Sequence, residues 1–335
     1  MLYPKNTILS IVSRDFILIA ILSLFFAGQS KGQETLPVYT DYMTDNVYLI
    51  HPAAAGIGNC SKLRLTARQQ WMGQDEAPQL QTLSTHIRVS KKTGIGIVAF
   101  NDKNGYHAQV GGQLTYAYHL RLSEEVSDQL SFGISAMGVR NTLDERDFVI
   151  PDPIINQQIN STFYVNADAG VAYHRGGLFS YFTAKNLLLS PRNQYNAYES
   201  LNLRRYLLTL GYYINKEDAI LQYEPSVMFQ YVEHTKEKFM DFNIKIYKPF
   251  DNGSIWGGLS YRRGLDSGTY EAPNYFTPVF GVNYKKFVVS YSYTKQQNNI
   301  LFDNGGFHQI TLGFDFLCRD YLPRLSSCPN LSGSF

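Results

Sequence analysis

The chain has 335 residues, of which 44% are hydrophobic and 17% are charged, with 26 Gly, 25 Tyr and 21 Phe. An ordinary globular protein carries about 25% charged residues, so this chain is poor in charge and rich in Tyr and Gly. That composition excludes a disordered chain, a collagen and a coiled coil. The formal net charge of +2 gives no general attraction for a nucleic-acid backbone, and no cluster of Lys and Arg compensates, so we expect no nucleic-acid partner.

Residues 1–32 have the pattern of a cleaved secretory signal peptide. Lys5 and Arg14 precede an apolar run over 16–28, and Ser30 and Gly32 supply small residues at the positions that a signal peptidase inspects. This run is shorter than the roughly 20 apolar residues that cross a bilayer, which disfavours the alternative of a retained anchor helix. No later stretch could form a membrane helix, so the exported protein is expected to be either soluble or a closed barrel.

From residue 62 to residue 317 the sequence alternates with the two-residue period of a β-strand. Near the C-terminal end, for example, Phe287, Val289 and Tyr291 point one way and Ser290 the other. On this basis we predict fourteen strands, at residues 62–71, 79–89, 94–104, 107–121, 128–141, 163–175, 177–187, 204–215, 219–232, 238–248, 252–262, 273–284, 286–296 and 306–317.

Strand length and composition favour a membrane barrel over a soluble sandwich. The predicted strands run to about 10 to 14 residues, whereas strands of soluble proteins usually have 5 or 6, and their apolar faces end in Tyr or Phe as interfacial girdles do. The predicted fold is all-β, a single closed antiparallel transmembrane β-barrel. An even strand number places both ends of the barrel in the periplasm and the long connections 141–163 and 187–204 outside. Pro225 and Pro278 predict bulges or barrel rims.

The sequence divides into a signal peptide (1–32), an N-terminal periplasmic or plug segment (33–61), the barrel (62–317) and a periplasmic tail (318–335). We expect the plug segment to fold into the barrel lumen or along its periplasmic mouth, because it is long, carries several Tyr and has a small-residue cluster through which backbone can pass closely. The candidate plug or partner contacts are Tyr42, Asn46, His51, Pro52, Ala53, Gly56, Trp71 and Gly73. For Trp71 and Gly73 a structural role in the first hairpin is favoured, as an interfacial anchor and a turn glycine.

The sequence contains few signs of catalysis. His119, His174 and Asp168 are predicted to face the lumen, where they could serve as a base and its partner. No Gly-x-Ser-x-Gly elbow supplies a nucleophile, and the cysteines have no C-x-x-C zinc spacing. We therefore predict a protein that is not an enzyme, with no catalytic residues, no metal, no cofactor and no small-molecule substrate.

We consider two pairings of the three cysteines, which are expected to lie in an oxidising compartment. The favoured one joins Cys318 to Cys328 and closes a short loop after the last strand. The alternative joins Cys60, before the first strand, to Cys318, since these strands are neighbours in a closed barrel.

A succession of short motifs resembles a known family. The sequence Asn46-Val47-Tyr48-Leu49-Ile50-His51-Pro52-Ala53-Ala54-Ala55-Gly56 stands before the first strand, and Arg68-Gln69-Gln70-Trp71-Met72-Gly73 follows. Further motifs are Ala77-Pro78-Gln79, Gly94-Ile95-Gly96, Asn101-Asp102-Lys103-Asn104-Gly105, Tyr116-Ala117-Tyr118, Leu130-Ser131-Phe132-Gly133, Tyr291-Ser292-Tyr293 and His308-Gln309-Ile310. The succession resembles the PorP/SprF family of type IX secretion system outer-membrane proteins and covers nearly all of the chain after residue 32. His51 and Gln309 stand where the family usually has Asn and Glu.

The resemblance implies a non-enzymatic barrel of the bacterial outer membrane that works with the type IX secretion and gliding motility machinery. Its implied partners are outer-membrane lipid, other proteins of that machinery and the C-terminal domain of a large secreted cell-surface adhesin. The alternative function is a passive or substrate-specific outer-membrane channel, because fourteen strands leave room for a lumen. A soluble periplasmic β-sandwich is a third possibility.

Overall fold

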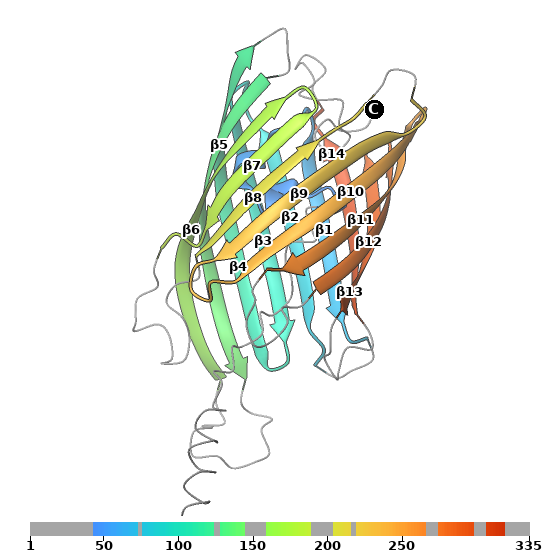
Figure 1. Cartoon of the computed structure of the whole chain (residues 1–335). Coiled ribbons are helices and arrows are strands. Elements are labelled where there is room, and N and C mark those ends of the chain that lie inside the picture. The colour runs from blue at the N-terminus through green and yellow to red at the C-terminus, as the bar shows by residue number, and fades with distance from the viewer. Residues whose placement is uncertain are drawn as a thin grey trace, which may run out of the picture. The chain divides into compact units, whose positions relative to one another are not determined.

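A computed structural model describes residues 43–72, 76–123, 128–144, 159–188, 204–215, 219–265, 274–297 and 306–318. These residues form one closed barrel of fourteen antiparallel strands, in which each strand pairs with its neighbours in sequence and the first pairs with the last (Figure 1). The strands are β1 Ser61–Gln70, β2 Gln79–Arg88, β3 Thr93–Asn104, β4 His107–Ser123, β5 Asp128–Asp144, β6 Ile159–Arg175, β7 Leu178–Lys185, β8 Arg205–Tyr212, β9 Gln222–Val232, β10 Lys238–Phe250, β11 Gly253–Gly264, β12 Asn274–Tyr284, β13 Phe287–Gln297 and β14 Phe307–Phe316. The predicted fold class and strand number are confirmed.

The barrel closes through β1 and β14, whose pairing runs without a register shift from Ser61↔Phe316 to Gln70↔Phe307. Closure leaves no free edge along this seam, which is the reason that a sheet can span a membrane as a barrel. Since the strand number is even, the start of β1 and the end of β14 lie at the same end of the barrel. We call this the seam end, and the opposite end the far end.

The two faces of the wall differ as the sequence predicts. Large apolar side chains point outward and are exposed, among them Leu114 at 63%, Ile134 at 61% and Phe280 at 64%. The alternate residues, which are small or polar, point inward and are buried. In β14, for example, Ile310 and Leu312 are exposed while Thr311 is buried. A soluble sandwich would bury its apolar faces between two sheets, so that alternative is wrong.

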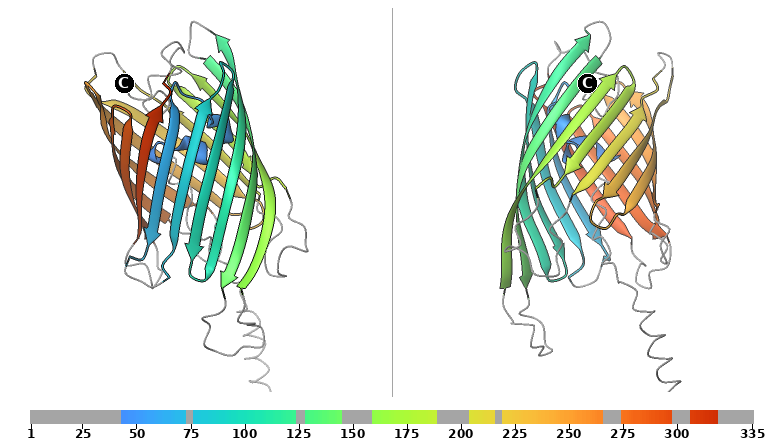
Figure 2. Two further views of the ribbon diagram at one scale, coloured as in Figure 1. Left: turned by 180° about the vertical axis from the view of Figure 1, so that it is seen from behind. Right: turned by 60° about the vertical axis from the view of Figure 1, so that its left-hand side comes forward.

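Strand lengths vary around the barrel. β4, β5 and β6 each have 17 residues, whereas β7 and β8 have 8. β5 and β6 therefore extend further toward the far end than the strands that follow them, as the green strands show in the right-hand view of Figure 2.

The bulges predicted at Pro225 and Pro278 are absent from the described strands. The register of β9 with β10 and of β11 with β12 continues through both prolines. Pairing is interrupted on one side of each proline. The β8–β9 ladder breaks after Gly211↔Ser226 and resumes at the bridge Ile214↔Tyr223, and β12–β13 pairing lapses between Phe276 and Val279. A proline lacks the N–H that the ladder needs, but the wall absorbs this loss without shifting its register.

The segment 43–60 lies inside the barrel, where two short 3-10 helices, η2 Val47–Leu49 and η3 Pro52–Ala54, are visible in blue through the wall (Figure 2). Its apolar side chains are buried, including Tyr48, Ile50 and Ala53. They form the main buried apolar cluster together with inward wall residues such as Val98 and Tyr181. None of the described helices is long and apolar enough to cross a membrane.

Candidate functional site

The interior segment 43–60 begins at a buried ionic cluster with β1 and β14. The Asp45 carboxylate accepts hydrogen bonds from Lys62 Nζ at 3.1 Å and from Arg64 Nη2 at 2.6 Å. Arg64 also pairs with Asp315 of β14 at 2.7 Å. All four side chains are almost fully buried, so removing one charge would leave its partners uncompensated in a medium of low polarity. The cluster therefore ties the segment to both strands of the seam.

Asn46 and Tyr48 extend these contacts to β2, β3 and β4. Asn46 Nδ2 donates to Ser84 Oγ at 3.0 Å, and Tyr48 Oη donates to Thr115 Oγ1 at 2.9 Å. The Tyr48 ring lies directly over Gly96, where a Cβ atom would approach the ring to 2.4 Å. Only glycine leaves room for the ring at this wall position.

His51 reaches across to the opposite part of the wall. Its Nδ1 and Nε2 atoms pair with the hydroxyls of Thr183 and Thr209, at 2.8 and 3.0 Å. Its ring stacks on Tyr181 with the centroids 4.8 Å apart. Both ring nitrogens and one ring face are thus used by the wall, and this fully buried histidine acts as a bridge between β7 and β8.

Pro52, Ala53 and Ala55 pass so close to the wall that their neighbours must be glycine. A Cβ on Gly133 of β5 would lie 2.3 Å from the Ala53 nitrogen, and one on Gly94 of β3 would lie 2.1 Å from the Ala55 carbonyl oxygen. Real Cβ atoms do not approach backbone so closely. The small residues of the segment and the inward glycines of the wall are therefore complementary in shape.

The segment leaves the interior through Gly56, which has a φ of +70° and so a conformation that favours glycine. The Gly56 amide donates to His86 Nδ1 at 3.0 Å, and its carbonyl accepts from Arg88 Nη1 at 3.3 Å. Beside it, His119 Nε2 lies 3.0 Å from the Ala55 carbonyl oxygen. The predicted contact residues Asn46, His51, Pro52, Ala53 and Gly56 thus all meet the wall.

Cys60, at the end of the segment, forms a disulfide with Cys318, just after β14. The favoured pairing of Cys318 with Cys328 is therefore wrong, and the alternative across the seam is the one formed. The reason is closure of the barrel: the full register of β1 with β14 places the residues that flank these strands side by side. Cys328 lies outside the described residues.

Of the other predicted contacts, only Trp71 lies within the described residues, and it stands apart from this interior site. Trp71 follows β1 at the far end and has a φ of +50°, consistent with a turn position in the first hairpin. Tyr42 and Gly73 lie outside the described residues.

The three candidate catalytic groups are held in separate structural contacts. His119 Nδ1 lies 2.9 Å from Ser131 Oγ, His174 Nε2 lies 2.8 Å from Tyr181 Oη, and Asp168 Oδ1 accepts the Asn186 amide at 2.9 Å. All three side chains are buried by at least 99%. In the pair of His119 with Ser131, the second ring nitrogen of His119 is occupied by the Ala55 carbonyl of the interior segment. Within the described ranges no three His, Cys, Asp or Glu side chains cluster as a metal site would require.

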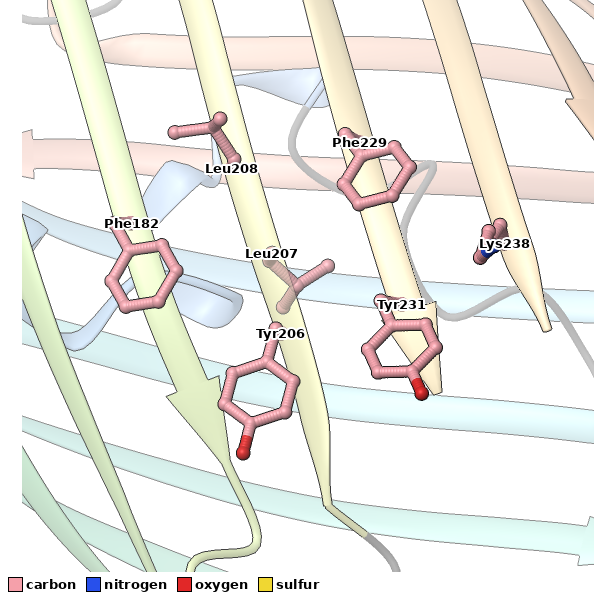
Figure 3. A pocket seen from close by; sticks show the side chains of 7 residues that line it. All are labelled: Phe182, Tyr206, Leu207, Leu208, Phe229, Tyr231 and Lys238. Carbon is pink, nitrogen blue, oxygen red and sulfur yellow. The ribbon is translucent and has the colours of Figure 1, made fainter. Parts of the chain in front are cut away.

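The outer surface carries a shallow apolar groove of about 410 Å³ near the far ends of β7 to β10. Figure 3 shows its lining side chains, from Phe182 of β7 to Lys238 of β10. The rings of Tyr206 and Tyr231 stack with centroids 6.2 Å apart, and Tyr206 Oη donates to Glu233 at 2.9 Å.

A comparison with protein-family models matches residues 31–314 to the family described as type IX secretion system membrane protein PorP/SprF. The chain belongs to this family. Since a closed barrel with an apolar outer belt is the form in which β-proteins span the bacterial outer membrane, this family member is an outer-membrane protein. A comparison with curated proteins finds no match.

Several solved structures are similar to this chain at low sequence identity. The monoaromatic hydrocarbon channel CymD is 10% identical with a TM-score of 0.47, covering 81% of this chain and 91% of its own. The P. putida toluene transporter TodX is 8% identical with a TM-score of 0.46, covering 81% and 94%. BamA from Haemophilus ducreyi is 10% identical with a TM-score of 0.42, covering 76% and 70%. These likenesses carry no argument about function.

The sequence did not predict the ionic cluster, nor the inward wall glycines against which the interior segment packs. Lys62 and Arg64 are neighbours on β1, but Asp45 and Asp315 come from other parts of the chain, and Asp315 reaches Arg64 only because the seam is closed. A signal was nevertheless present: Lys62 and Arg64 are charges on the inward face of β1, where a buried cation needs a partner.

Proposed function

We propose that this chain is a non-enzymatic barrel of the type IX secretion and gliding machinery that helps the export or surface anchoring of a large secreted adhesin-like protein. Membership of the PorP/SprF family supports a role in this machinery. The observation that carries the proposal is the occupied interior: a segment of the chain is fastened across the lumen by ion pairs, hydrogen bonds and a disulfide.

A fastened interior favours partner binding over passive conduction. A diffusive channel needs a continuous polar path, whereas here η2 and η3 and their apolar side chains fill the middle of the barrel. We propose that residues 33–61 act as a plug, that a signal peptide over 1–32 is removed on export and that residues 318–335 form a periplasmic tail. The barrel wall and its loops are then the surfaces available to partners.

The first experiment measures secretion. Deletion of the gene that encodes this chain is expected to lower the surface level of at least one type IX secreted protein by tenfold or more. Quantitative proteomics of surface-labelled cells measures that level. Expression of the full chain should restore that level. Unchanged surface proteins after deletion would overturn the proposal.

The second experiment measures conduction. In planar bilayers the intact barrel should be silent, and deleting residues 36–56 should raise its conductance or prevent assembly, because the plug fills the lumen and supports the wall. Steady, solute-selective conductance of the intact chain would favour the channel function instead. A deletion that affects neither conductance nor assembly would argue against a plug.

A further inference from the structure

The apolar groove on the outer surface belongs to the face of the wall that meets lipid. Its lining includes Phe182, Leu208 and Phe229, from three adjacent strands, and these side chains alternate with buried neighbours that point into the lumen (Figure 3). Phe182 and Leu208 are 47% and 38% exposed. Because the outer face of an outer-membrane barrel is surrounded by acyl chains, a lipid chain is the occupant that this apolar hollow meets in the membrane.

The groove opens at the level of the lipid headgroups. β7 and β8, which carry part of its lining, have 8 residues each, whereas a membrane-spanning strand usually has about 9–11. On the side of the strand ends the groove is bordered by Tyr206 and Tyr231, whose rings stack with centroids 6.2 Å apart. Tyrosines at strand ends mark the interface between lipid and water. A chain in the groove would therefore carry its headgroup next to these rings.

A cation stands at the same border. Lys238, the first residue of β10, is the charged residue of the described lining, and it is exposed, as is Lys236 in the preceding turn. The nearby Glu233 carboxylate already accepts hydrogen bonds from Arg204 Nη1 at 3.3 Å and from Tyr206 Oη at 2.9 Å. A lysine ammonium has three N–H donors, so Lys238 can bind a phosphate in addition to a contact within the chain. The groove thus combines an apolar floor with a cation at headgroup height.

We propose that the groove binds lipid A of the outer leaflet, with one acyl chain over Leu208 and a phosphate on Lys238. Lipid A is the phosphorylated, acylated glucosamine disaccharide of that leaflet, and the far end of the barrel is the end expected to face outward. The proposal depends on the outer-membrane location and on this orientation, and it does not depend on the proposed function. It adds a defined lipid site to a face that otherwise contacts lipid without selection.

The first test separates the phosphate from the rest of the lipid. Lipid A, or lipid A from which the phosphates have been removed, is added to the full barrel in mild detergent, and native mass spectrometry gives the dissociation constant. Lys238→Gln should weaken the binding of lipid A by about fivefold, as expected for one exposed ion pair. The same variant should bind the dephosphorylated lipid as the unaltered barrel does, within twofold.

Lys285→Gln is the matched control for charge. Lys285 is also exposed and also lies beside a tyrosine, 5.4 Å from the centroid of the Tyr284 ring, but it stands at the seam end of the barrel. Its removal should change the affinity for lipid A by less than twofold. An equal weakening by Lys238→Gln and Lys285→Gln would show a general effect of charge and would overturn the proposal.

A second pair of variants tests the acyl chain. Leu208→Trp fills the groove with a larger side chain, whereas Leu210→Trp makes the same change at the next outward residue of β8, which is 49% exposed and lies outside the described lining. Both keep an apolar side chain toward lipid, so both should assemble. We expect the Leu208 variant to bind lipid A at least fivefold more weakly and the Leu210 variant to bind within twofold of the unaltered barrel. If Leu208→Trp does not assemble, the two lysine variants decide alone.

The source of the lipid and the rival occupant are tested on barrel purified from its own outer membrane. The mass of the lipid that it retains should be that of lipid A, and Lys238→Gln should reduce the retained amount. A retained phospholipid in place of lipid A would overturn the assignment to the outer leaflet. Lipid A that binds only after proteolytic cleavage within the connection 189–203 would show that the chain fills its own groove, and the proposal would fail. None of these results bears on secretion, so the proposed function is tested separately.

Discussion

At the residue scale, the interior depends on a few side chains whose exact size and charge matter. The Ala55 carbonyl packs against Gly94 of β3 so closely that a Cβ atom there would overlap it. Asp45 supplies the negative charge that both Lys62 and Arg64 bind. Neither residue is exposed, so water cannot replace what a substitution removes.

Gly94→Ala should destabilise the barrel, because the new methyl group would overlap the Ala55 carbonyl oxygen, at 2.1 Å. Overpacking of this kind costs about 1–3 kcal/mol. The free energy of unfolding, measured by denaturant titration of the refolded barrel, tests this value. Gly112→Ala is the control, since the nearest atom to its Cβ, Val98 O, lies at 3.5 Å; equal stability of the two variants would contradict the close contact.

Asp45→Asn should lower the free energy of unfolding by about 3–5 kcal/mol, the usual cost of breaking a buried ion pair. The variant keeps the shape of the side chain but removes the charge that both cations share. Glu76→Gln provides the comparison, because Glu76 pairs with Lys103 where the two side chains are 46% and 39% exposed, and such pairs contribute about 0–1 kcal/mol. Similar losses in the two variants would show that the Asp45 cluster is not a strong tether.

At the scale of elements, the seam between β1 and β14 is held by its ladder and by the Cys60–Cys318 disulfide. The bond connects residues 258 positions apart, so it restricts nearly the whole barrel sequence in the unfolded state. It also fixes the point at which the interior segment joins the wall.

Cys60→Ser should therefore lower the free energy of unfolding by about 2–5 kcal/mol, the range found on removal of native disulfides. Denaturant titration under non-reducing conditions measures this loss, and peptide mapping checks the pairing. Cys328→Ser is the matched substitution and should leave the Cys60–Cys318 peptide intact. Recovery of a Cys318–Cys328 peptide from the unaltered protein would contradict the pairing.

At the scale of the whole molecule, the barrel requires lipid around it. Its outward face carries Leu114, Ile134 and Phe280, each more than 60% exposed, and these side chains would be unfavourable in water. The inward face is mostly polar and packs against the segment 43–60, whose apolar side chains form a buried cluster with some inward wall residues. The molecule differs from a soluble protein in exposing its large apolar side chains around the outside of the wall.

Leu114→Arg, near the middle of β4, should strongly reduce assembly, because a cation at the bilayer midplane costs about 2–4 kcal/mol. The folded fraction after insertion into vesicles can be followed from the gel mobility of heated and unheated samples. Met72→Arg is the control: Met72 is equally exposed, at 64%, but follows β1 at the far end, where the cost is about 0–1 kcal/mol. Equal assembly of both variants would contradict the assigned lipid-facing belt.

The sequence by itself determined the strands, their number and the direction of each face. These follow from the two-residue alternation and the turn residues, which are local properties: Ile310, Thr311 and Leu312 reveal their orientations without any knowledge of neighbouring strands. For residues 33–61 the sequence left two positions open, inside the lumen or along its periplasmic mouth. Strand ends were less certain, since β5 and β6 extend past their predicted limits to Asp144 and Ile159.

Only the tertiary structure decided which residues meet. The pairing of Cys60 with Cys318, the cluster of Asp45 with Arg64 and Asp315, and the position of Thr183 and Thr209 around His51 all join residues from distant parts of the chain. The alternation of apolar and polar residues predicts whether each side chain points inward or outward, but it does not predict which residue that side chain contacts. Partners are set by closure of the barrel and by its strand register, which depend on all fourteen strands together.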